Sequence, residues 1–197
     1  MKELPVEIEA KFFPVDPETI RATLRDNGAE CVHPERLMRR VLYRKTENPG
    51  IGGDYLRVRD EGDCVRVSLK IHAREGGAVS DQREIDVVTE DFDRSVLLMD
   101  SLGFRKTNYQ ENRRETWRLG GGEITIDWWP GLEPYVEIEA ATEPELELMA
   151  GLLGFEWNAR RVGSVAYLYA DAYGMDHDEA MALLEHCTFE ENPFAKK

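Results

Sequence analysis

Apolar and polar residues alternate over several short stretches of this chain, and turn residues separate these stretches. The first one, from Glu7 to Phe13, begins with charged residues at positions 7, 9 and 11 and apolar residues at 8, 10 and 12. Because successive side chains of a strand point to opposite faces, this alternation predicts a β-strand with one polar face. Comparable patterns predict further strands at residues 39–45, 55–59, 65–71, 83–88, 105–119, 124–128 and 135–140.

Other stretches carry the marks of helices and turns. Asp16-Pro17-Glu18 supplies an N-cap, a proline at the first helical position and an acidic first turn, and this helix should end near Gly28. Residues 91–102 form a second predicted helix. Asp60-Glu61-Gly62-Asp63 is predicted to be a hairpin turn. From residue 143 the pattern is helical up to Cys187, and residues 189–197 are expected to be a loosely held end.

These elements predict an α+β fold with about eight strands. Eight strands are also about the number that closes a small β-barrel. The length of 197 residues is enough to bury a sizeable core and favours a single domain.

The polar faces of the predicted strands each carry charges of one sign. Acidic pairs stand at Glu7 and Glu9, at Glu84 and Asp86, and at Glu137 and Glu139, whereas basic pairs stand at Arg57 and Arg59 and at Arg66 and Lys70. A sheet with one face in water produces the same alternation, and for any single strand that is the better explanation. For the whole set, the recurring acid-x-acid pair and the preference for arginine, whose planar fork suits phosphate oxygens, favour a charged interior.

The chemistry of such an interior follows from its charges. Carboxylates two positions apart on one strand face lie about 7 Å from each other. Buried together they repel, and desolvation costs several kcal/mol per ion unless something neutralises them. Divalent cations with oxygen ligands, Mg²⁺ or Mn²⁺, do this, while arginine and lysine bind polyphosphate oxygens directly. The pattern therefore indicates a site for a metal–polyphosphate complex.

Two neighbouring arginines are separated by strand parity. Trp117 and Leu119 are expected on the apolar face, and Arg113 shares their parity. Arg114 then falls on the polar face with Thr116 and is the one of the pair that we expect in the site. In the predicted strand of residues 124–128, alternation places Asp127 on the polar face.

The composition narrows the class of partner. The formal net charge of -14 disfavours binding to a nucleic acid polymer or an anionic membrane unless the 25 basic residues are segregated. No apolar run approaches the length that crosses a bilayer, and the segment Met1–Pro5 lacks the basic-then-apolar order of a signal peptide, so a cytoplasmic protein is expected. Three widely spaced cysteines and four histidines without ligand spacing indicate neither a disulfide framework nor a zinc site, and packing or surface roles are favoured for all seven.

These residues carry a resemblance to a known family. Glu7-Ile8-Glu9-Ala10-Lys11 is similar to the E-x-E-x-K signature of CYTH proteins, the triphosphate tunnel metalloenzymes that include class IV adenylyl cyclases, thiamine triphosphatases and inorganic triphosphatases. The later pieces follow in the family's order: Leu56–Arg59, Ser68–Lys70, Arg83–Asp86, Arg113–Glu115, Ile126–Asp127 and Val136–Glu139, with Asp127–Gly131 and Pro134–Tyr135 resembling one bacterial branch. The resemblance covers about residues 6–174. It implies a tunnel domain over residues 1–175, followed by a C-terminal helix and tail over residues 176–197.

The resemblance also implies a fold and a set of site residues. The fold would be an eight-stranded antiparallel closed β-barrel, a tunnel with helices packed outside. The implied metal ligands for Mg²⁺ or Mn²⁺ are Glu7, Glu9, Glu137 and Glu139, with Glu84, Asp86 and Asp127 as helpers. The substrate-binding set is Lys11, Arg57, Arg59, Arg66, Lys70 and Arg114, of which Lys11 and Arg57, together with Glu9, are the expected catalytic residues.

Two departures from the family pattern concern the expected ligands. Asp86 is one methylene shorter than the glutamate that relatives often carry, which makes direct ligation there less certain. The strand with Tyr43 lacks the acidic residue that many relatives have after the aromatic. Arg40, Arg44 and Lys106 are candidates for extra phosphate contacts, with surface charge as the favoured role for each.

Three functions stay open from the sequence. The first is metal-dependent hydrolysis of an inorganic, thiamine or nucleoside triphosphate, with Lys11 stabilising charge or taking part in proton transfer. The second is a class IV adenylyl cyclase that converts ATP to cyclic AMP and pyrophosphate, although no residue pattern specifies adenine. The third is a polyphosphate or nucleotide-binding module without turnover. In each case the partner is a small triphosphate, and a homodimer through the C-terminal helices is left open.

Overall fold

The computed structural model describes residues 4–72 and 77–195. The first three residues of the segment Met1–Pro5 are therefore not among the described residues. The strands in these ranges are β1 (Val6–Phe12), β2 (Glu30–Arg44), β3 (Tyr55–Asp60), β4 (Val65–Ile71), β5 (Gln82–Thr89), β6 (Asn108–Leu119), β7 (Gly122–Trp129), β8 (Leu132–Ala140) and β9 (His186–Cys187). The α-helices are α1 (Pro17–Asp26), α2 (Phe92–Ser101), α3 (Glu143–Leu152), α4 (Ala166–Tyr173) and α5 (His177–Leu183). None of the helices described is long and apolar enough to cross a membrane.

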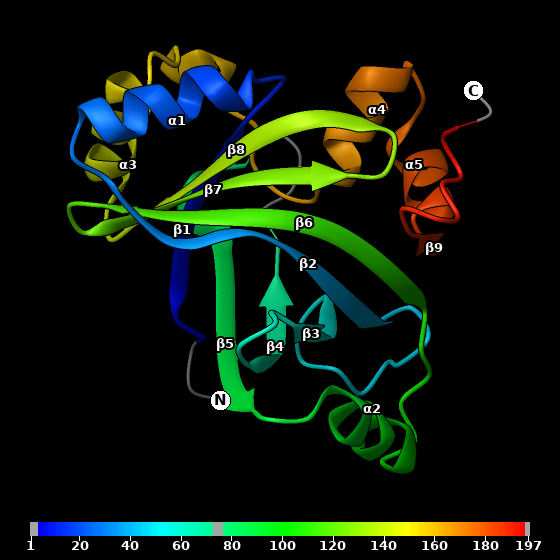
Figure 1. The fold of residues 1–197 in the computed structure, drawn as a ribbon. Helices are drawn as coiled ribbons and strands as arrows, with labels where there is room; N and C mark the ends of the chain where they lie inside the picture. Colours follow the sequence, from blue (N-terminus) through cyan, green and yellow to red (C-terminus); the bar gives the residue numbers. More distant parts are fainter. Residues whose placement is uncertain (1–3, 73–76, 196–197) are drawn as a thin grey trace.

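Eight of the described strands close into an antiparallel barrel (Figure 1). Their order is β2-β3-β4-β5-β1-β8-β7-β6, and pairing of β6 with β2 completes the ring. The short β9 lies outside this ring and pairs in parallel with β6. The predicted fold, an α+β protein with an eight-stranded antiparallel closed barrel and helices outside, is therefore confirmed.

Closure depends on β2, which is longer than the sequence pattern predicts. The strand begins at Glu30 rather than near residue 39, and its first part pairs with β6 alone. The register between β2 and β6 shifts twice between Cys31 and Arg36, around Pro34, which has no N–H to donate to the ladder. These irregularities break the alternation, which is why the first half of β2 does not have the pattern of a strand.

Three apolar clusters attach the helices to the outside of the barrel. Ile20 and Leu24 of α1 and Leu146 of α3 pack against β1, β7 and β8, where the outward-facing Ile126 and Ile138 are fully buried. A second cluster joins α2 to the outer faces of β2 and β3 and includes Val58. A third lies under α4 and α5. The first two clusters lie on outer faces of the barrel, whereas Trp129, Tyr135, Val165 and Leu184 of the third also line the cavity inside.

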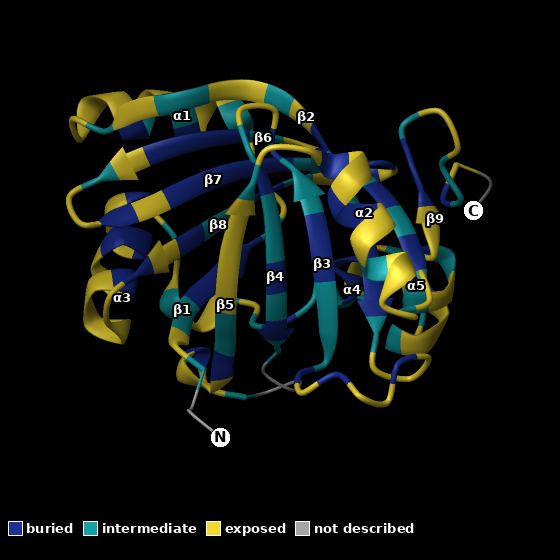
Figure 2. Cartoon of the chain, turned by 90° about the horizontal axis from the view of Figure 1, so that it is seen from below, coloured by how far each residue is buried: buried dark blue, intermediate teal, exposed yellow. Residues whose placement is uncertain are grey.

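The outer face of β5 differs from the expectation. Of the residues predicted to face outer helices, Ile8, Val58, Val67, Ile126 and Ile138 belong to or pack against the apolar clusters. Ile85 faces outward but is 46% exposed, because no helix in the described ranges covers β5 (Figure 2). Strand parity predicts to which side of the barrel wall a side chain points. Whether that side chain is buried depends on where the helices pack.

The C-terminal segment also differs from its predicted form. The helical pattern after residue 143 is interrupted between α3 and α4 and ends in the short strand β9. The described part of the tail is anchored, since Phe194 is 2% exposed and its ring lies 4.1 Å from that of Tyr169 and 5.1 Å from that of Tyr173. The expectation of a loosely held end is wrong for residues up to 195.

Two leucines of α3 provide a matched test of this packing. Leu146→Ala removes a side chain that is 0% exposed in the main cluster and is expected to lower the free energy of unfolding by about 2–5 kcal/mol. Leu148→Ala changes the same helix at a position that is 65% exposed and should have little effect. Urea denaturation of both variants measures the difference, and equal losses would contradict the packing of α3 on the barrel.

Candidate functional site

The barrel encloses a cavity of about 830 Å³ with charged walls. Because side chains alternate along each strand, every strand of the ring sends one polar row inward. The predicted site residues that line the cavity are Glu7, Glu9, Lys11, Arg57, Arg59, Arg66, Lys70, Glu84, Asp86, Arg114, Glu137 and Glu139. Asp127, the remaining predicted residue, is completely buried behind Arg114. The structure thus gathers residues from seven strands in one place.

One ion-pair network joins β1, β6, β7 and β8. The Lys11 ammonium lies 2.8 Å from a carboxylate oxygen of Glu9 and 2.8 Å from one of Glu137. Arg114 donates to Asp127 at 2.9 Å and to Glu137 at 3.1 Å. Glu137 therefore accepts from two bases and fixes both of them.

Asp127 has a different surrounding from the other acids. Its oxygens accept from Arg114, from Asn112 at 2.9 Å and from Thr125 at 2.8 Å. The exposed fraction of its side chain is 0%. This carboxylate is fully used within the wall, and its contacts hold the Arg114 guanidinium toward the cavity. Arg113 lies on the other face, where its side chain is half exposed and pairs with Glu35.

A second network joins β1, β3, β4 and β5. Lys70 lies 2.9 Å from Glu7 and also contacts Glu84. Arg57 donates to Glu84 at 2.9 Å and to Ser68 at 3.2 Å. Glu84 has the same role here as Glu137 has in the first network, because each of them accepts hydrogen bonds from one lysine and one arginine and orients both.

A third network contains a residue that the sequence analysis missed. Glu61 was assigned to an exposed hairpin turn, but it is buried in the cavity wall. Arg59 Nε donates to it at 2.7 Å and Arg66 Nε at 3.3 Å, while Arg66 also contacts Asp86. The parity of Arg57 and Arg59 continues to Glu61, and this was the available signal.

Burial and like charges shift the pKa values of the acids. Burial, with repulsion from Glu9, raises the pKa of Glu7 to about 9. Burial, with repulsion from Glu9 and Glu123, raises the pKa of Glu139 to about 7. Burial alone would also raise the pKa of Glu61, but Arg59 and Arg66 together bring it down to about 2. Glu7 and Glu139 are thus short of compensating positive charge, whereas Glu61 is not.

Acidic side chains form a row across three neighbouring strands. Glu9 of β1 stands directly opposite Glu139 of β8, which in turn stands opposite Glu123 of β7. Like charges directly opposite each other destabilise a sheet. Glu139 makes no ion pair with any described residue. The row is therefore a place where a cation would stabilise the fold.

The donor set fits Mg²⁺ or Mn²⁺ in its chemistry. Carboxylate oxygens are the ligands that these hard cations prefer. Within residues 4–72 and 77–195, no three acidic, histidine or cysteine side chains converge as closely as the ligands of a bound metal do. Glu9 and Glu137 are turned toward Lys11 instead, and Glu7 toward Lys70. The cavity therefore supplies carboxylate oxygens of the kind that such a cation binds. Some of these oxygens are engaged in ion pairs with Lys11 and Lys70.

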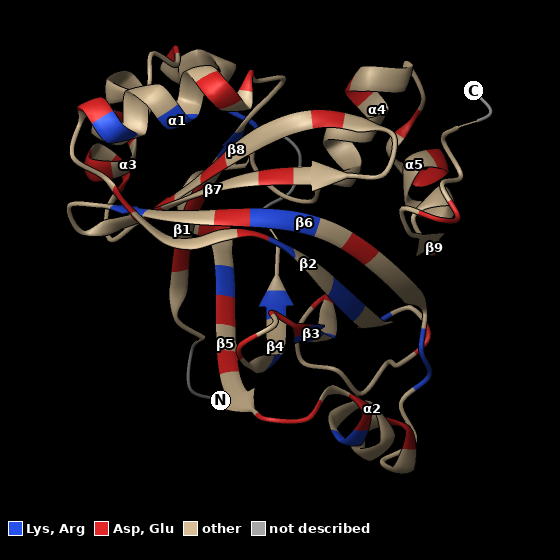
Figure 3. Cartoon of the chain, viewed as in Figure 1, with Lys and Arg blue, Asp and Glu red and all other residues tan. Residues whose placement is uncertain are grey.

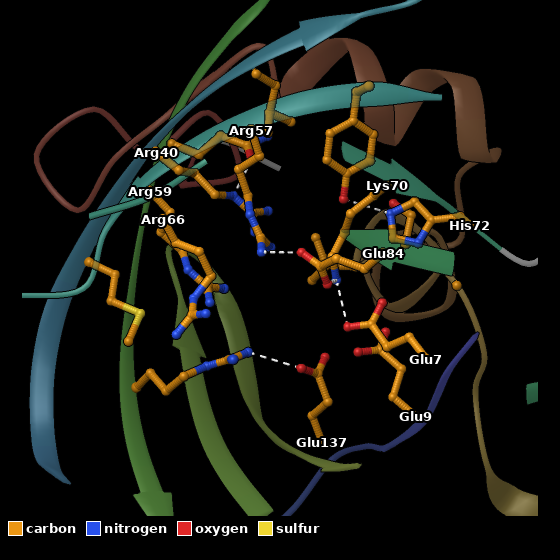
Figure 4. A pocket seen from close by; sticks show the side chains of 18 of the residues that line it. Glu7, Glu9, Arg40, Arg57, Arg59, Arg66, Lys70, His72, Glu84 and Glu137 are labelled. Carbon is orange, nitrogen blue, oxygen red and sulfur yellow. Dashed lines mark hydrogen bonds and ion pairs between the residues drawn. The ribbon is translucent and has the colours of Figure 1, made fainter. Parts of the chain in front are cut away.

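Several arginines and the two acids of β1 lie on opposite sides of the cavity. Figure 4 shows Arg40, Arg57, Arg59 and Arg66 together on one side, with Glu7 and Glu9 on the other. Lys70 and Glu84 lie between these groups and connect them. A polyanion placed between the two sides would contact the bases directly and the acids through a cation.

Several cavity residues had been expected elsewhere. Arg40 and Arg44 were assigned to surface charge, yet both line the cavity, whereas Lys106 is about half exposed and pairs with Asp100. His72 was assigned a packing or surface role and also lines the cavity, where burial beside Lys70 lowers its pKa well below the usual range. Arg40 lies within β2, Arg44 at its end and His72 just after β4, and nothing in the local sequence shows that these side chains are covered.

Comparison with known proteins identifies the family. The model of the CYTH domain matches residues 6–152. The chain belongs to the CYTH family. The match includes all eight strands of the ring and α3, and it ends before α4 and α5. No curated protein sequence matches the chain.

Solved structures share the fold of this CYTH protein. A protein from Vibrio parahaemolyticus, named as a candidate adenylate cyclase, has a TM-score of 0.70 at 14% identity, over 85% of this chain and 99% of that one. The PH1012 protein of Pyrococcus horikoshii OT3 has a TM-score of 0.64 at 19% identity, over 79% and 94%. HpAC1 of Hippeastrum, a candidate adenylyl cyclase described as having a dominant triphosphatase activity, has a TM-score of 0.52 at 16% identity, over 86% and 97%.

Proposed function

We propose that this CYTH protein is a hydrolase that cleaves a triphosphate in its barrel with the help of Mg²⁺ or Mn²⁺. The observation that carries the proposal is the division of the cavity into a row of carboxylates and a facing group of arginines and lysines. The family supports the triphosphate, since CYTH proteins are mostly triphosphate tunnel enzymes. The triphosphatase activity described for the Hippeastrum protein supports hydrolysis as the reaction.

We assign the acids to two roles. Glu9 and Glu139, with Glu7 and Glu137, are the proposed metal ligands. A divalent cation held by these carboxylates would supply positive charge to offset the negative charge of the phosphates and of the leaving group. Glu84, Asp86 and Asp127 are the proposed positioning residues, because each holds a basic or hydroxyl side chain in the cavity wall.

The bases bind and orient the substrate. Arg57, Arg59, Arg66, Lys70 and Arg114 are the proposed contacts for phosphate oxygens, and their planar or ammonium donors suit these acceptors. Lys11 is held between Glu9 and Glu137 and points to the middle of the cavity. We propose that it stabilises negative charge on the phosphoryl group that is transferred to water. Arg57 does the same from β3.

A product assay separates hydrolysis from the two other functions. The protein is incubated with tripolyphosphate, thiamine triphosphate and ATP, each with Mg²⁺ or Mn²⁺, and the products are identified by ³¹P NMR and chromatography. Release of orthophosphate is the expected result for at least one substrate. Pyrophosphate with cyclic AMP would show a cyclase instead. Binding of all three without any product would show a binding module and would overturn the proposal.

A further inference from the structure

One end of the cavity has a different composition from the rest. This end is covered by α4 and α5, and Arg40, Arg44 and Trp129 line it together with residues of these helices (Figure 1). Among the ion pairs of the described residues, none involves Arg40 or Arg44, although Asp54 and Asp178 line the same cavity. Every other arginine proposed as a phosphate contact has a carboxylate partner.

The two guanidinium groups make only neutral contacts. Arg40 donates to Gln110 at 2.9 Å and lies 4.3 Å above the ring of Trp129. Arg44 donates to Asn108 at 2.9 Å and reaches the sulfur of Met181 in α5 at 3.4 Å. Burial, reinforced by Arg57 nearby, lowers the pKa of Arg40 to about 10. Both cations would therefore be stabilised by an anion.

Unused hydrogen-bonding atoms lie at the same end. Trp129 is 3% exposed, and its indole N–H finds no acceptor in the described ranges. The Nε2 atom of His177, which also lines the cavity, is buried without a described partner. A buried donor without an acceptor costs about 1–3 kcal/mol, so an acceptor is expected from outside the chain.

The aromatic faces at this end are already in contact with other side chains. Arg40 covers the ring of Trp129, and the rings of Tyr167 and His177 lie 4.2 Å apart. Tyr55 is engaged with His72 through a hydrogen bond of 2.9 Å. A nucleobase needs a free ring face to stack on. At this end of the cavity the aromatic rings already contact other side chains, while hydrogen-bond donors remain without acceptors. This arrangement fits an anionic group better than an aromatic base.

The position of this end relative to the proposed triphosphate contacts follows from the register. Arg40 stands directly opposite Arg59, and Arg44 stands opposite Tyr55 on the same pair of strands. Four residues of strand separate Arg40 from Arg44, which places their backbones about 13 Å apart. The basic side of the cavity thus continues along β2 past the level of Arg59 and Arg57.

We propose that Arg40, Arg44 and the indole N–H of Trp129 form an additional anion subsite, which takes the end phosphate of a linear inorganic polyphosphate longer than three units. This inference rests on the proposed function, because the remaining phosphates occupy the proposed triphosphate contacts. It narrows the substrate class from any triphosphate to an inorganic phosphate chain. The subsite needs no metal, because the protein groups that form it are all hydrogen-bond donors and can contact phosphate oxygens directly.

Calorimetry of two phosphate chains tests the subsite. The wild-type protein is titrated in EDTA, which removes divalent cations, with tripolyphosphate and with tetrapolyphosphate. The longer chain is expected to bind about tenfold more tightly, which is the effect of one charged hydrogen-bonding contact. Arg44→Gln should bring the two Kd values together while leaving the Kd of tripolyphosphate near its wild-type value. ATP, which carries a nucleoside in place of a fourth phosphate, should bind no more tightly than tripolyphosphate.

Two further variants complete the design. Arg105→Gln makes the same charge change at a position that is 76% exposed, and it should keep the tenfold preference. Trp129→Phe replaces the indole by a smaller ring without the N–H and should weaken binding of tetrapolyphosphate alone, which keeps the test decisive if Arg44→Gln does not fold. Equal wild-type affinities for the two chains, or a preference that survives Arg44→Gln, would overturn the subsite but not the triphosphatase. Failure of both chains to bind, with Mg²⁺ as well as in EDTA, would overturn the proposed function as well.

Discussion

Arg114→Gln is expected to lower kcat/KM for the triphosphate by about 10²–10³-fold, the usual effect of removing one preorganised charged donor. Arg114 is the base that Asp127 and Glu137 hold together in the cavity wall. The substitution also leaves the buried Asp127 with only Asn112 and Thr125 as donors. Steady-state kinetics with the best substrate of the product assay measure the loss, and thermal unfolding shows whether the fold survives.

The adjacent residue provides the control. Arg113→Gln removes the same charge one position earlier, on the outer face, where the side chain is half exposed beside Glu35. Its kcat/KM should stay within about twofold of wild type, because surface substitutions rarely matter. A comparable loss in both variants would show that strand parity does not separate site from surface in β6. Wild-type activity in Arg114→Gln would remove this arginine from the proposed substrate contacts.

The second large effect concerns the carboxylate row. Glu9→Gln and Glu139→Gln each replace a charged ligand by a neutral amide of the same shape. The concentration of Mg²⁺ or Mn²⁺ that gives half-maximal activity is expected to rise by at least about 10–100-fold, since even indirect partners of metal ligands have effects of that size. Titration of activity against metal concentration measures the shift, and binding of Mn²⁺ followed by electron paramagnetic resonance gives it without turnover.

The same two substitutions also have an expected effect on the stability of the metal-free protein. Glu139 stands opposite both Glu9 and Glu123 and has no ion-pair partner among the described residues, so Glu139→Gln relieves repulsion and should leave the metal-free fold as stable as wild type or more so. Glu9→Gln also removes a carboxylate partner of the buried Lys11, so the same gain is not expected there. Glu147→Gln, an exposed residue of α3, is the matched control and should change neither property. An unchanged metal requirement in both Glu9→Gln and Glu139→Gln would show that the row does not hold the metal.

Strand parity made most of the interior predictable. On β1, β3, β4, β5 and β8, alternation alone placed pairs such as Glu7 and Glu9 on the face that the structure turns inward. Alternation has this power because a slip of one residue would expose the whole apolar face. Alternation does not show whether the polar face is in contact with water or with a cavity. The charge pattern and the family resemblance indicated a cavity.

The parts that sequence did not predict share a physical cause. Arg40 and Arg44 lie in the part of β2 that pairs regularly with β3, and Glu61 follows β3 in a turn sequence, so in neither case does the local sequence show that the side chain is covered. The cover over Arg40 and Arg44 comes from α4 and α5, whose docking is set by contacts with residues far away in the chain. Such long-range contacts leave no local pattern, so these residues appeared to be surface charges.

The acidic character of the protein agrees with its fold once the charges are located. Acidic residues lie on α3, α4 and α5 outside the barrel, while many of the basic residues line the cavity (Figure 3). A formal net charge of -14 therefore coexists with a basic wall inside. The outer surface should repel long polyanions such as nucleic acids, and the interior admits a small one.

The central claim is that the barrel interior holds the triphosphate and its metal. A crystal structure grown with Mn²⁺ and a non-hydrolysable imidotriphosphate, with anomalous diffraction to locate manganese, tests it most directly. The account predicts a manganese peak beside Glu9 and Glu139, with phosphate oxygens on Arg57, Arg59 and Arg114. Manganese or imidotriphosphate bound only outside the barrel, with the cavity side chains still paired to one another, would contradict it.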